Sequence, residues 1–470
     1  MGLIQNIKLT SFIKEKTIRF DVKFLDYYNN INYNYYTYKD LFDFIEYKKL
    51  DISKLDDFKY VEIGNVTKLG DIYPVSLSFD NRNEINEDYF KKIEKGDIIK
   101  PKKGDILLSK IRPYLNKNIL IQDEDCYFTK AMIQIRPKIN STLFYYTLRT
   151  SFFDLINAVS RQGKGYPTLR EEDLKSIKFP KLIIDALILS KLKLLKKIEP
   201  IEKEIKDLKS QKKEHLEIIN DVFSDELKFD WDKFNTIKKE KIFTLSLLHF
   251  SNNKDLRCGY KFHNKENQFL YDFLTSKTTK KIKDFIDEPI VLGKSITPSL
   301  YDEDGEHYYI AMSNIKNYRF DTEDCKKVGI KYFTDNKNKS IQLNDILLAR
   351  SGEGTIGKVA LIEDEDVKGI FADFTMRIRL TNYNQQFAYY YFRSDFFQYL
   401  VYTHKKGLGN NTNIFPSQLQ EFPLLDFDLK HQQRLADKIQ TQINSQKYID
   451  EKIKNKQDEI SKIIEDCINE

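Results

Sequence analysis

The sequence repeats itself at a period of about 240 residues, and this repeat limits the folds that the chain can adopt. Segments of the first half return in the same order in the second half. GDILLS (104–109) matches NDILLA (344–349), and YYTLR (145–149) matches YYYFR (389–393). Matches that keep their order over such a distance indicate two copies of one domain. We therefore predict two similar domains, as a length of 470 residues allows.

Within each copy, short apolar runs are broken by turn residues, which is typical of β-strands. MIQIRP (132–137) in the first copy and TMRIRL (375–380) in the second are examples. The aromatic segments 143–159 and 387–403 repeat their apolar residues every three or four positions, which predicts a helix lying on the sheet. The fold class expected for each copy is therefore α+β, with mostly antiparallel strands.

Each copy ends in a segment whose apolar residues also step by threes and fours, which predicts a long amphipathic helix. The apolar positions are Ile198, Ile201, Ile205, Leu208 and Ile219 in the first copy, and Leu435, Ile439, Ile449, Ile453, Ile460 and Ile463 in the second. Two long stripes in one chain most simply bury each other. We therefore predict that the two helices pack together.

The stretch SGEGTIGKVALI (351–362) fits two glycine-rich phosphate-binding patterns. A phosphate loop needs Ser or Thr after its lysine and a helix beginning there, but Val359 follows Lys358 and the next residues predict a strand. The matching region of the first copy, 110–118, contains no glycine. We expect a glycine turn between two strands. The alternative is a nucleotide-binding enzyme that uses the loop from Gly352 to Lys358.

Other chemistry is sparse in the sequence. The four cysteines and six histidines have no metal-ligand spacing, and the acidic runs 123–125 and 363–366 are expected to be solvated turns. We expect no metal site and no catalytic residues. The net charge of +6 permits nucleic-acid binding without requiring it. Without a signal segment or an apolar run of membrane length, a cytoplasmic protein outside the membrane is expected.

The paired signatures G-D-I-L-L, G-x-I-G-K-V-A and F-P-x-L, with a long helix after each half, resemble the specificity (S) subunit of type I restriction-modification systems, the HsdS family. The resemblance implies two target recognition domains, each reading half of a split DNA sequence, and an antiparallel coiled coil of the two helices. It also implies docking of two methyltransferase (M) subunits, with restriction (R) subunits joining through them. S-adenosylmethionine and ATP with Mg²⁺ would then bind to those partners and not to this chain, which would be a non-catalytic subunit acting in DNA methylation and phage defence.

On this resemblance, residues 1–182 and 224–428 are the recognition domains, and 183–223 and 429–470 are the conserved spacer helices. The stripe residues given above would form the coiled coil and the partner-docking helices. His431, Gln432 and Gln433 approximate the Glu-Gln pair that often begins such a helix, whereas the first helix lacks it. Because the two halves differ at most surface positions, we expect an asymmetric DNA target.

Candidates for DNA contact follow from residue type, since Arg and Lys in loops contact phosphate or guanine and Asn and Gln pair with adenine. The candidates are Lys110, Arg112, Lys117, Arg161, Gln162, Lys164 and Tyr166 in the first half, and Arg350, Lys358, Lys405, Lys406, Asn410 and Asn411 in the second. The glycine-containing loops 161–166 and 405–411 occur at matching places in the two copies. A second alternative is a coiled-coil scaffold whose globular halves bind protein and do not recognise a DNA sequence.

Overall fold

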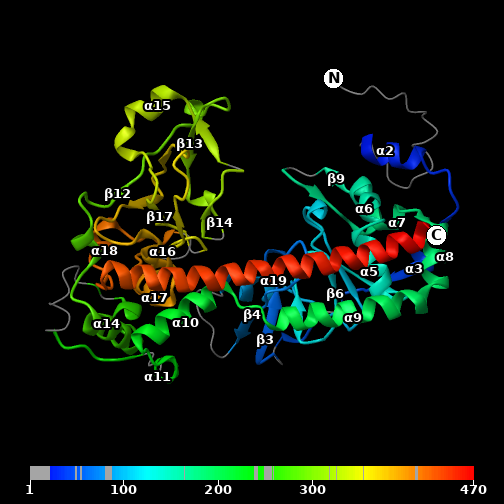
Figure 1. The fold of residues 1–470 in the computed structure, drawn as a ribbon, viewed down its shortest axis with the longest axis horizontal. Coiled ribbons are helices and arrows are strands. Elements are labelled where there is room, and N and C mark those ends of the chain that lie inside the picture. Colours follow the sequence, from blue (N-terminus) through cyan, green and yellow to red (C-terminus); the bar gives the residue numbers. More distant parts are fainter. Residues whose placement is uncertain are drawn as a thin grey trace. The chain divides into compact units, whose positions relative to one another are not determined.

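The computed structural model describes residues 22–469 except 48–49, 53–54, 80–86, 163–164, 238–241, 248–256, 258, 317, 324, 353 and 408–410. It divides into two compact units (Figure 1). Unit 1 comprises Met1–Gln211 and Ile449–Glu470, and unit 2 comprises Lys212–Tyr448. Each unit contains one copy of the repeat and part of the C-terminal helix. The units therefore cut across the helical segments 183–223 and 429–470 that the sequence suggests.

Unit 1 contains two small sheets. The four-stranded sheet has the antiparallel order β2 (Phe42–Phe44), β8 (Met132–Pro137), β5 (Ile106–Ser109) and β6 (Ile119–Leu120). The three-stranded sheet has the order β4 (Val75–Ser78), β3 (Asp57–Val61) and β7 (Cys126–Phe128), with β3 and β7 parallel. Strand β5 is buried along its whole length because Ile106 and Leu108 enter one apolar core and Leu107 enters another.

Unit 2 repeats this arrangement. Its four-stranded sheet has the antiparallel order β12 (Val291–Leu292), β20 (Thr375–Ile378), β17 (Ile346–Ala349) and β18 (Val359–Leu361). Its three-stranded sheet has the order β16 (Lys326–Val328), β13 (His307–Ile310) and β19 (Gly369–Phe371), again with one parallel pair, β13 and β19. The prediction of an α+β fold with mostly antiparallel strands is confirmed.

The aromatic segments are helical, as predicted, but each forms two helices. They are α5 (Ser141–Arg149) and α6 (Phe153–Val159) in unit 1, and α16 (Gln385–Arg393) and α17 (Asp395–His404) in unit 2. The side chains of Asn140 and Asn384 begin α5 and α16 by accepting hydrogen bonds from the backbone three residues on, at 3.0 and 2.8 Å. Most of the aromatic rings of these helices are buried in the cores. The many Tyr and Phe residues there serve packing.

The remaining elements are short. In unit 1 they are α2 (Val22–Asn29), β1 (Tyr35–Tyr36), α3 (Tyr38–Leu41), η2 (Ile63–Asn65), α4 (Glu87–Glu94), η4 (Pro113–Leu115), β9 (Arg161–Gln162), β10 (Pro167–Thr168), α7 (Glu171–Ser176) and β11 (Phe179–Pro180). In unit 2 they are α11 (Trp231–Asn235), α13 (Tyr260–His263), α14 (Lys265–Lys277), η5 (Ile282–Phe285), η6 (Pro298–Leu300), η7 (Met312–Asn314), β14 (Ile315–Lys316), β15 (Arg319–Phe320), α15 (Ile330–Asp335), η8 (Lys337–Lys339) and α18 (Pro416–Leu419). β1 pairs with β11, β9 with β10, and β14 with β15, each antiparallel.

The segment after the first sheet forms three helices, α8 (Lys181–Leu189), α9 (Lys191–Ser210) and α10 (His215–Leu227), where the sequence predicts a single helix. Pro200 lies inside α9, and the interruption comes at 211–214. The C-terminal segment is one continuous helix, α19 (Leu429–Asn469). Among the described residues no helix is both long enough and apolar enough to cross a membrane.

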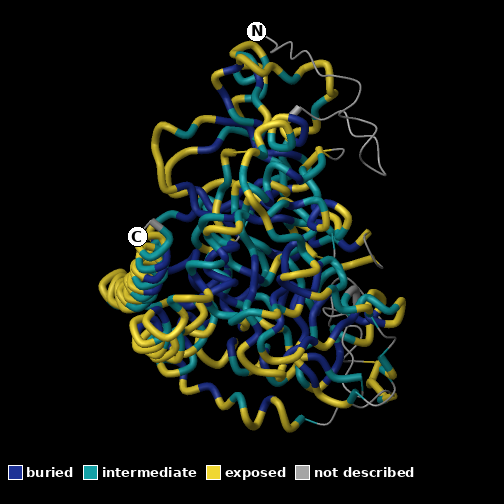
Figure 2. Tube along the Cα trace, turned by 90° about the vertical axis from the view of Figure 1, so that its right-hand side faces the viewer, coloured by how far each residue is buried: buried dark blue, intermediate teal, exposed yellow. Residues whose placement is uncertain are grey.

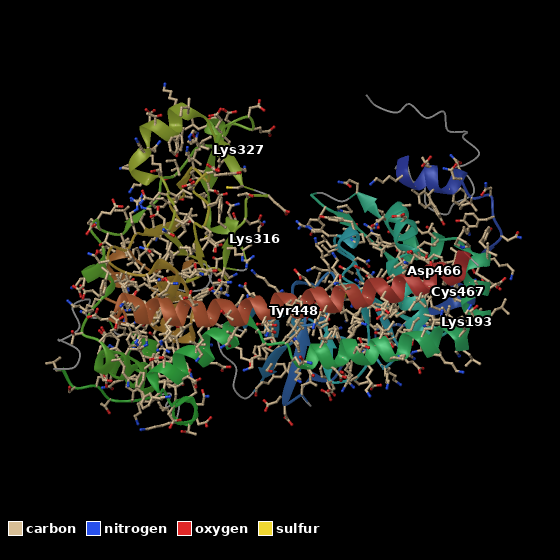
Figure 3. The ribbon with its side chains drawn as sticks, viewed as in Figure 1. Lys193, Lys316, Lys327, Tyr448, Asp466 and Cys467 are labelled. Carbon is tan, nitrogen blue, oxygen red and sulfur yellow. The ribbon has the colours of Figure 1, made fainter. Side chains whose placement is uncertain are left out.

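In unit 1, α9 packs against the second part of α19. The buried side chains of Ile198, Ile201 and Ile205 share one core with Ile453 and Ile460. Leu208, Ile449 and Ile463 are partly buried against the same core. Lys456 Nζ lies 2.9 Å from Glu204 Oε2 between the two helices. Figure 3 places Lys193, near the start of α9, at the same end of the helix pair as Cys467, near the end of α19, as an antiparallel pair requires.

In unit 2, α10 packs against the first part of α19. Ile219 and Val222 share a core with Leu435, Ile439 and Ile443. Two contacts fix the direction of the pair. The Lys213 backbone amide donates to Gln446 Oε1 at 2.9 Å, and Glu226 Oε1 lies 2.9 Å from His431 Nε2. The order of these contacts makes the pair antiparallel. In Figure 2 exposed residues lie along the outer side of the helix that ends at the C label.

The packing of α19 in unit 1 predicts the effect of a single truncation. Ile460 is fully buried, so Ile460→Ala leaves a cavity and should lower the free energy of unfolding by about 2–5 kcal/mol. Lys454 is exposed on the same helix, and Lys454→Ala should change the free energy by less than about 0.5 kcal/mol. Urea unfolding followed by circular dichroism measures both, and equal effects would contradict the helix packing.

Candidate nucleic-acid interface

In unit 1 the predicted contact residues lie in two loops that the backbone joins. The loop after β5 runs beside the hairpin of β9 and β10. Leu169 N donates to Lys110 O at 2.9 Å, and Arg112 N donates to Pro167 O at 2.9 Å. Ile111 also forms an isolated β-bridge with Thr168. We call residues 110–117 and 161–170 loop pair 1.

In unit 2 the same three links join the loop after β17 to the segment before α18. Ile414 N donates to Arg350 O at 2.9 Å, and Gly352 N donates to Thr412 O at 3.2 Å. Ser351 forms the isolated bridge with Asn413. We call residues 350–358 and 405–415 loop pair 2. The two loop pairs are built alike although their sequences differ.

The glycine-rich stretch is a turn between β17 and β18. Gly352 and Gly357 have φ values of +84° and +85°, which glycine adopts without strain. Ala349 N donates to Lys358 O and Gly357 N donates to Ala349 O, which closes the turn. Strand β18 begins directly afterwards at Val359, so the prediction that this loop enters a strand is confirmed. A nucleotide loop would instead lead into the amino end of a helix, where free amides converge on phosphate.

The cations of loop pair 1 differ in whether their charged groups are hydrogen-bonded within the protein. Lys110 Nζ donates to Lys130 O at 2.7 Å, and Lys117 Nζ donates to Ile63 O at 3.1 Å. Burial lowers the pKa of both ammonium groups, and for Lys117 the charges of Lys68 and Arg112 add to this. Arg112 is exposed, and its guanidinium lies 5.6 Å from the ring centre of Tyr166. Arg112 is therefore the more accessible cation of this loop.

Arg161, chosen as a DNA contact, is engaged in an internal ion pair. Its Nε lies 2.6 Å from Oδ1 of Asp173, whose side chain is fully buried. A buried carboxylate needs a partner, because burial of an unpaired charge is costly. The structure thus gives Arg161 a structural role. Gln162 beside it is exposed.

Two cations of loop pair 2 bond to Asn413, Arg350 through its side chain and Lys406 through its backbone. Arg350 Nε donates to Asp373 O at 3.0 Å, and its Nη1 donates to Asn413 Oδ1 at 3.1 Å. The backbones of Lys406 and Asn413 exchange two hydrogen bonds of 2.7 Å, and Gly407 between them has a φ of +101°. Lys405 Nζ lies 5.1 Å from the ring centre of Tyr402.

Lys358 is half-buried at the end of the glycine turn. Burial lowers the pKa of its ammonium group, and among the described residues that group has neither a hydrogen bond nor an ion pair. A partly desolvated cation without a partner gains from an added anion. Asn411 in the same loop pair is exposed. Lys164 and Asn410 lie outside the described residues.

The acidic runs are turns, as expected. Asp125 N donates to Asp123 Oδ1 and Asp366 N donates to Asp364 Oδ1, which are side-chain turns of the same form in both units. Within the part of the chain that the structure describes, no group of three or more His, Cys, Asp or Glu side chains is placed to hold a metal ion.

The stripe residues proposed for partner docking are turned inward, as described for α9, α10 and α19. A partner can reach other apolar residues instead. Leu182, Leu189 and Leu192, on α8 and at the start of α9, are 75, 85 and 76% exposed. An open pocket of about 380 Å³ lies beside them, lined in part by Ile188 and Lys191. We call Leu182, Ile188, Leu189 and Leu192 the α8 patch.

The glutamines at the start of α19 bind within unit 2. Gln432 is almost fully buried; its Oε1 accepts from Asn384 N at 2.8 Å and its Nε2 donates to Phe427 O at 2.6 Å. Gln433 Oε1 accepts from the Asn384 side chain at 2.7 Å. These amides tie α19 to the start of α16. The two glutamines that approximate a partner-docking motif therefore have structural roles within unit 2.

No protein-family model matches the sequence, and no curated protein matches it. Three solved structures align with 93% of this chain. One, from a type I R-M system described for its complex assembly and conformational transition, has 14% identity, 97% coverage of that chain and a TM-score of 0.39. The HsdS subunit from Thermoanaerobacter tengcongensis has 14% identity, 97% coverage and a TM-score of 0.33, and the type I S subunit from M. genitalium has 13%, 96% and 0.36. The chain is similar to structures of type I restriction-modification systems, two of which are specificity (S) subunits.

Sequence reasoning missed the residues that hold the loop pairs in place. Asn413 links Arg350 to the segment before α18, and the ring centres of Phe374 and Phe415 lie 5.4 and 5.7 Å from the Arg350 guanidinium. Tyr47 has its ring 5.3 Å from Lys110 Nζ. Aligning the two copies residue by residue through the strands that flank the loops would have drawn attention to positions 374 and 415.

Proposed function

We propose that this chain is the sequence-specific DNA-binding subunit of a type I restriction-modification complex and that it performs no catalysis itself. The observation that carries the proposal is the pair of equivalent loop pairs. Two units of the same strand order present basic side chains on loops that are joined by the same backbone hydrogen bonds. A duplicated fold with matched basic loops suits a duplex with two half-sites.

Within each unit the accessible cations would meet DNA phosphates or base edges. Arg112 in unit 1 and Lys358 in unit 2 suit this role because neither is bound to a carboxylate in the described structure. Phosphate contacts supply affinity and position the protein, whereas contacts to base edges supply specificity. Arg161 is excluded from the proposed contacts because Asp173 already neutralises its charge.

The recognised sequence would be bipartite and asymmetric. The residues that link each loop pair form equivalent backbone hydrogen bonds, but their side chains differ, for example Lys110 against Arg350 and Arg112 against Gly352. Side chains with different donors select different bases, since each base pair has its own pattern of donors and acceptors in the major groove. Each unit would thus read a different half-site.

The helical segments would connect the chain to its partners. The α8 patch, in contrast to the buried stripe residues, offers exposed leucine side chains among lysines 181, 191 and 193. We infer that it takes part in docking the methyltransferase subunits, which would carry S-adenosylmethionine. Restriction subunits would join through them with ATP and Mg²⁺. A protein-binding scaffold without DNA specificity would also use this patch, so DNA selectivity separates the two functions.

A domain swap tests the bipartite target. Replacing residues 1–182 with those of a similar specificity subunit of known target should change one half of the methylated sequence and leave the other half as it was. The reason is that each loop pair belongs to one unit. Sequencing of methylated sites in cells that express the hybrid with its methyltransferase gives the result. A change in both halves would refute separate reading by the two units.

Removal of single cations tests the phosphate contacts. Arg112→Gln and Lys358→Gln should each weaken binding to every duplex sequence and reduce the slope of log K against log salt by about one. Fluorescence anisotropy between about 50 and 200 mM salt measures the slope. Lys454→Gln on the exposed face of α19 is the matched control and should leave it unchanged. An unaltered slope in either loop variant would exclude that residue.

A charge placed in the α8 patch tests partner docking. Leu189→Asp should weaken co-purification of the methyltransferase at least about tenfold, because it removes an apolar contact and buries a carboxylate. Affinity for DNA should stay the same. Ile330→Asp on α15 of unit 2 is the control, since Ile330 is also well exposed. Normal assembly of the Leu189 variant would show that the partner docks elsewhere.

A further inference from the structure

Four groups lie close to the guanidinium of Arg350. Its guanidinium lies 5.4 Å from the ring centre of Phe374 and 5.7 Å from that of Phe415. Nε and Nη1 donate to Asp373 O and to Asn413 Oδ1. A guanidinium has five N–H donors, and these two bonds leave both N–H groups of Nη2 and one of Nη1 without a partner among the described residues. Two hydrogen bonds therefore orient the group, while N–H donors on both Nη1 and Nη2 stay available.

The orientation of its guanidinium by two hydrogen bonds distinguishes Arg350 from an ordinary surface cation. Phe374 and Phe415 are 44 and 38% exposed, so the rings reach the surface together with the guanidinium. Arg350 has no ion pair within the described residues, and burial lowers the pKa of its guanidinium. A flexible charge suffices for a phosphate contact. A planar, oriented fork instead matches two adjacent acceptors.

The repeat shows what part of this arrangement is structural. Lys110 occupies the equivalent position in unit 1, because its backbone amide donates to Ala131 O as that of Arg350 donates to Phe374 O, both at 3.0 Å. Lys110 Nζ also donates to the carbonyl of the preceding residue, Lys130, as Arg350 Nε does to Asp373 O. Any cation that reaches the carbonyl can fasten this turn. The hydrogen bond from Arg350 to Asn413 and the two neighbouring rings are not needed to hold this turn.

Besides Lys110 and Arg350, and Ala131 and Phe374, a third pair of positions is equivalent in the two units. Arg170 and Phe415 each directly precede a short helix, α7 and α18, and each backbone amide donates to the side chain three residues on. Unit 1 therefore carries Lys110, Ala131 and Arg170 where unit 2 carries Arg350, Phe374 and Phe415. We call these the three variable positions. The backbone is the same at all three, and the chemistry differs at each.

We propose that Arg350, beside the rings of Phe374 and Phe415, reads a guanine in the half-site of unit 2 through the major groove. The inference rests on the proposed function and names the base that this site takes. Guanine presents O6 and N7 as two adjacent acceptors, which fit the end of a guanidinium, whereas adenine presents a donor in place of O6. Because Lys110 replaces Arg350 in unit 1, the three variable positions select different bases in the two half-sites.

The experiment is a selection from a library of random duplex DNA with the full-length chain and with Arg350→Lys. The substitution keeps the charge and, as Lys110 does, can keep the carbonyl bond. We expect wild-type protein to select one guanine in one half-site. Arg350→Lys should lose that preference by roughly ten- to a hundredfold while the other half-site and the salt slope stay the same. Phe374→Leu should weaken the preference in part.

Lys331→Arg on α15 should change nothing, and a thermal melt of each variant shows whether it remains folded. An unchanged guanine preference in Arg350→Lys, or an equal loss of affinity for every sequence, would overturn the inference and leave the proposed function in place. If wild-type protein selects no sequence at all, the proposed function fails and the inference fails with it.

Discussion

A buried aspartate in each unit supports the sheet that carries the proposed interface. Asp105 and Asp345 are fully buried at the start of β5 and β17. The guanidinium of Arg136 donates hydrogen bonds of 2.7 and 3.0 Å to the Asp105 carboxylate, and that of Arg379 donates hydrogen bonds of 2.7 and 2.8 Å to the Asp345 carboxylate. A buried carboxylate needs a paired charge, and a bidentate arginine supplies one with a defined geometry. The ion pair therefore fixes the register between β5 and β8, and between β17 and β20, whose far ends lead into the loop pairs.

Burial on both faces of the central strands makes this support rigid. Alternate residues of β5 and of β17 enter different apolar cores, so a shift of one residue would exchange the contents of two cores. The aromatic helices cover one face of each sheet and also contact the long helices. Loops that begin at such strands start from a well-defined position. This explains how the linking residues of the two loop pairs form the same backbone hydrogen bonds in spite of their different sequences.

The sequence predicted what depends on local pattern and on the repeat. Strand β18 after Lys358 and the aromatic helices follow from the spacing of apolar residues. What it did not predict depends on partners distant in the chain. Arg161 is an exposed cation by composition, and only the fold brings Asp173 against it. The break at 211–214 and the burial of Ile443 on α19 likewise depend on packing that a spacing rule does not contain.

Some cations of the loop pairs hold the loops in place, and others are available to a ligand. Lys110 and Arg161 are tied to a carbonyl and to a carboxylate, so removing them would disturb the loops themselves. Lys358 has no such bond within the described structure, and Arg350 combines two such bonds with N–H donors that have no partner there. A recognition surface needs both kinds, because specificity requires donors held in place and affinity requires charge left unpaired. In a duplicated fold the first kind keeps the backbones alike, and the second kind is free to differ between the copies.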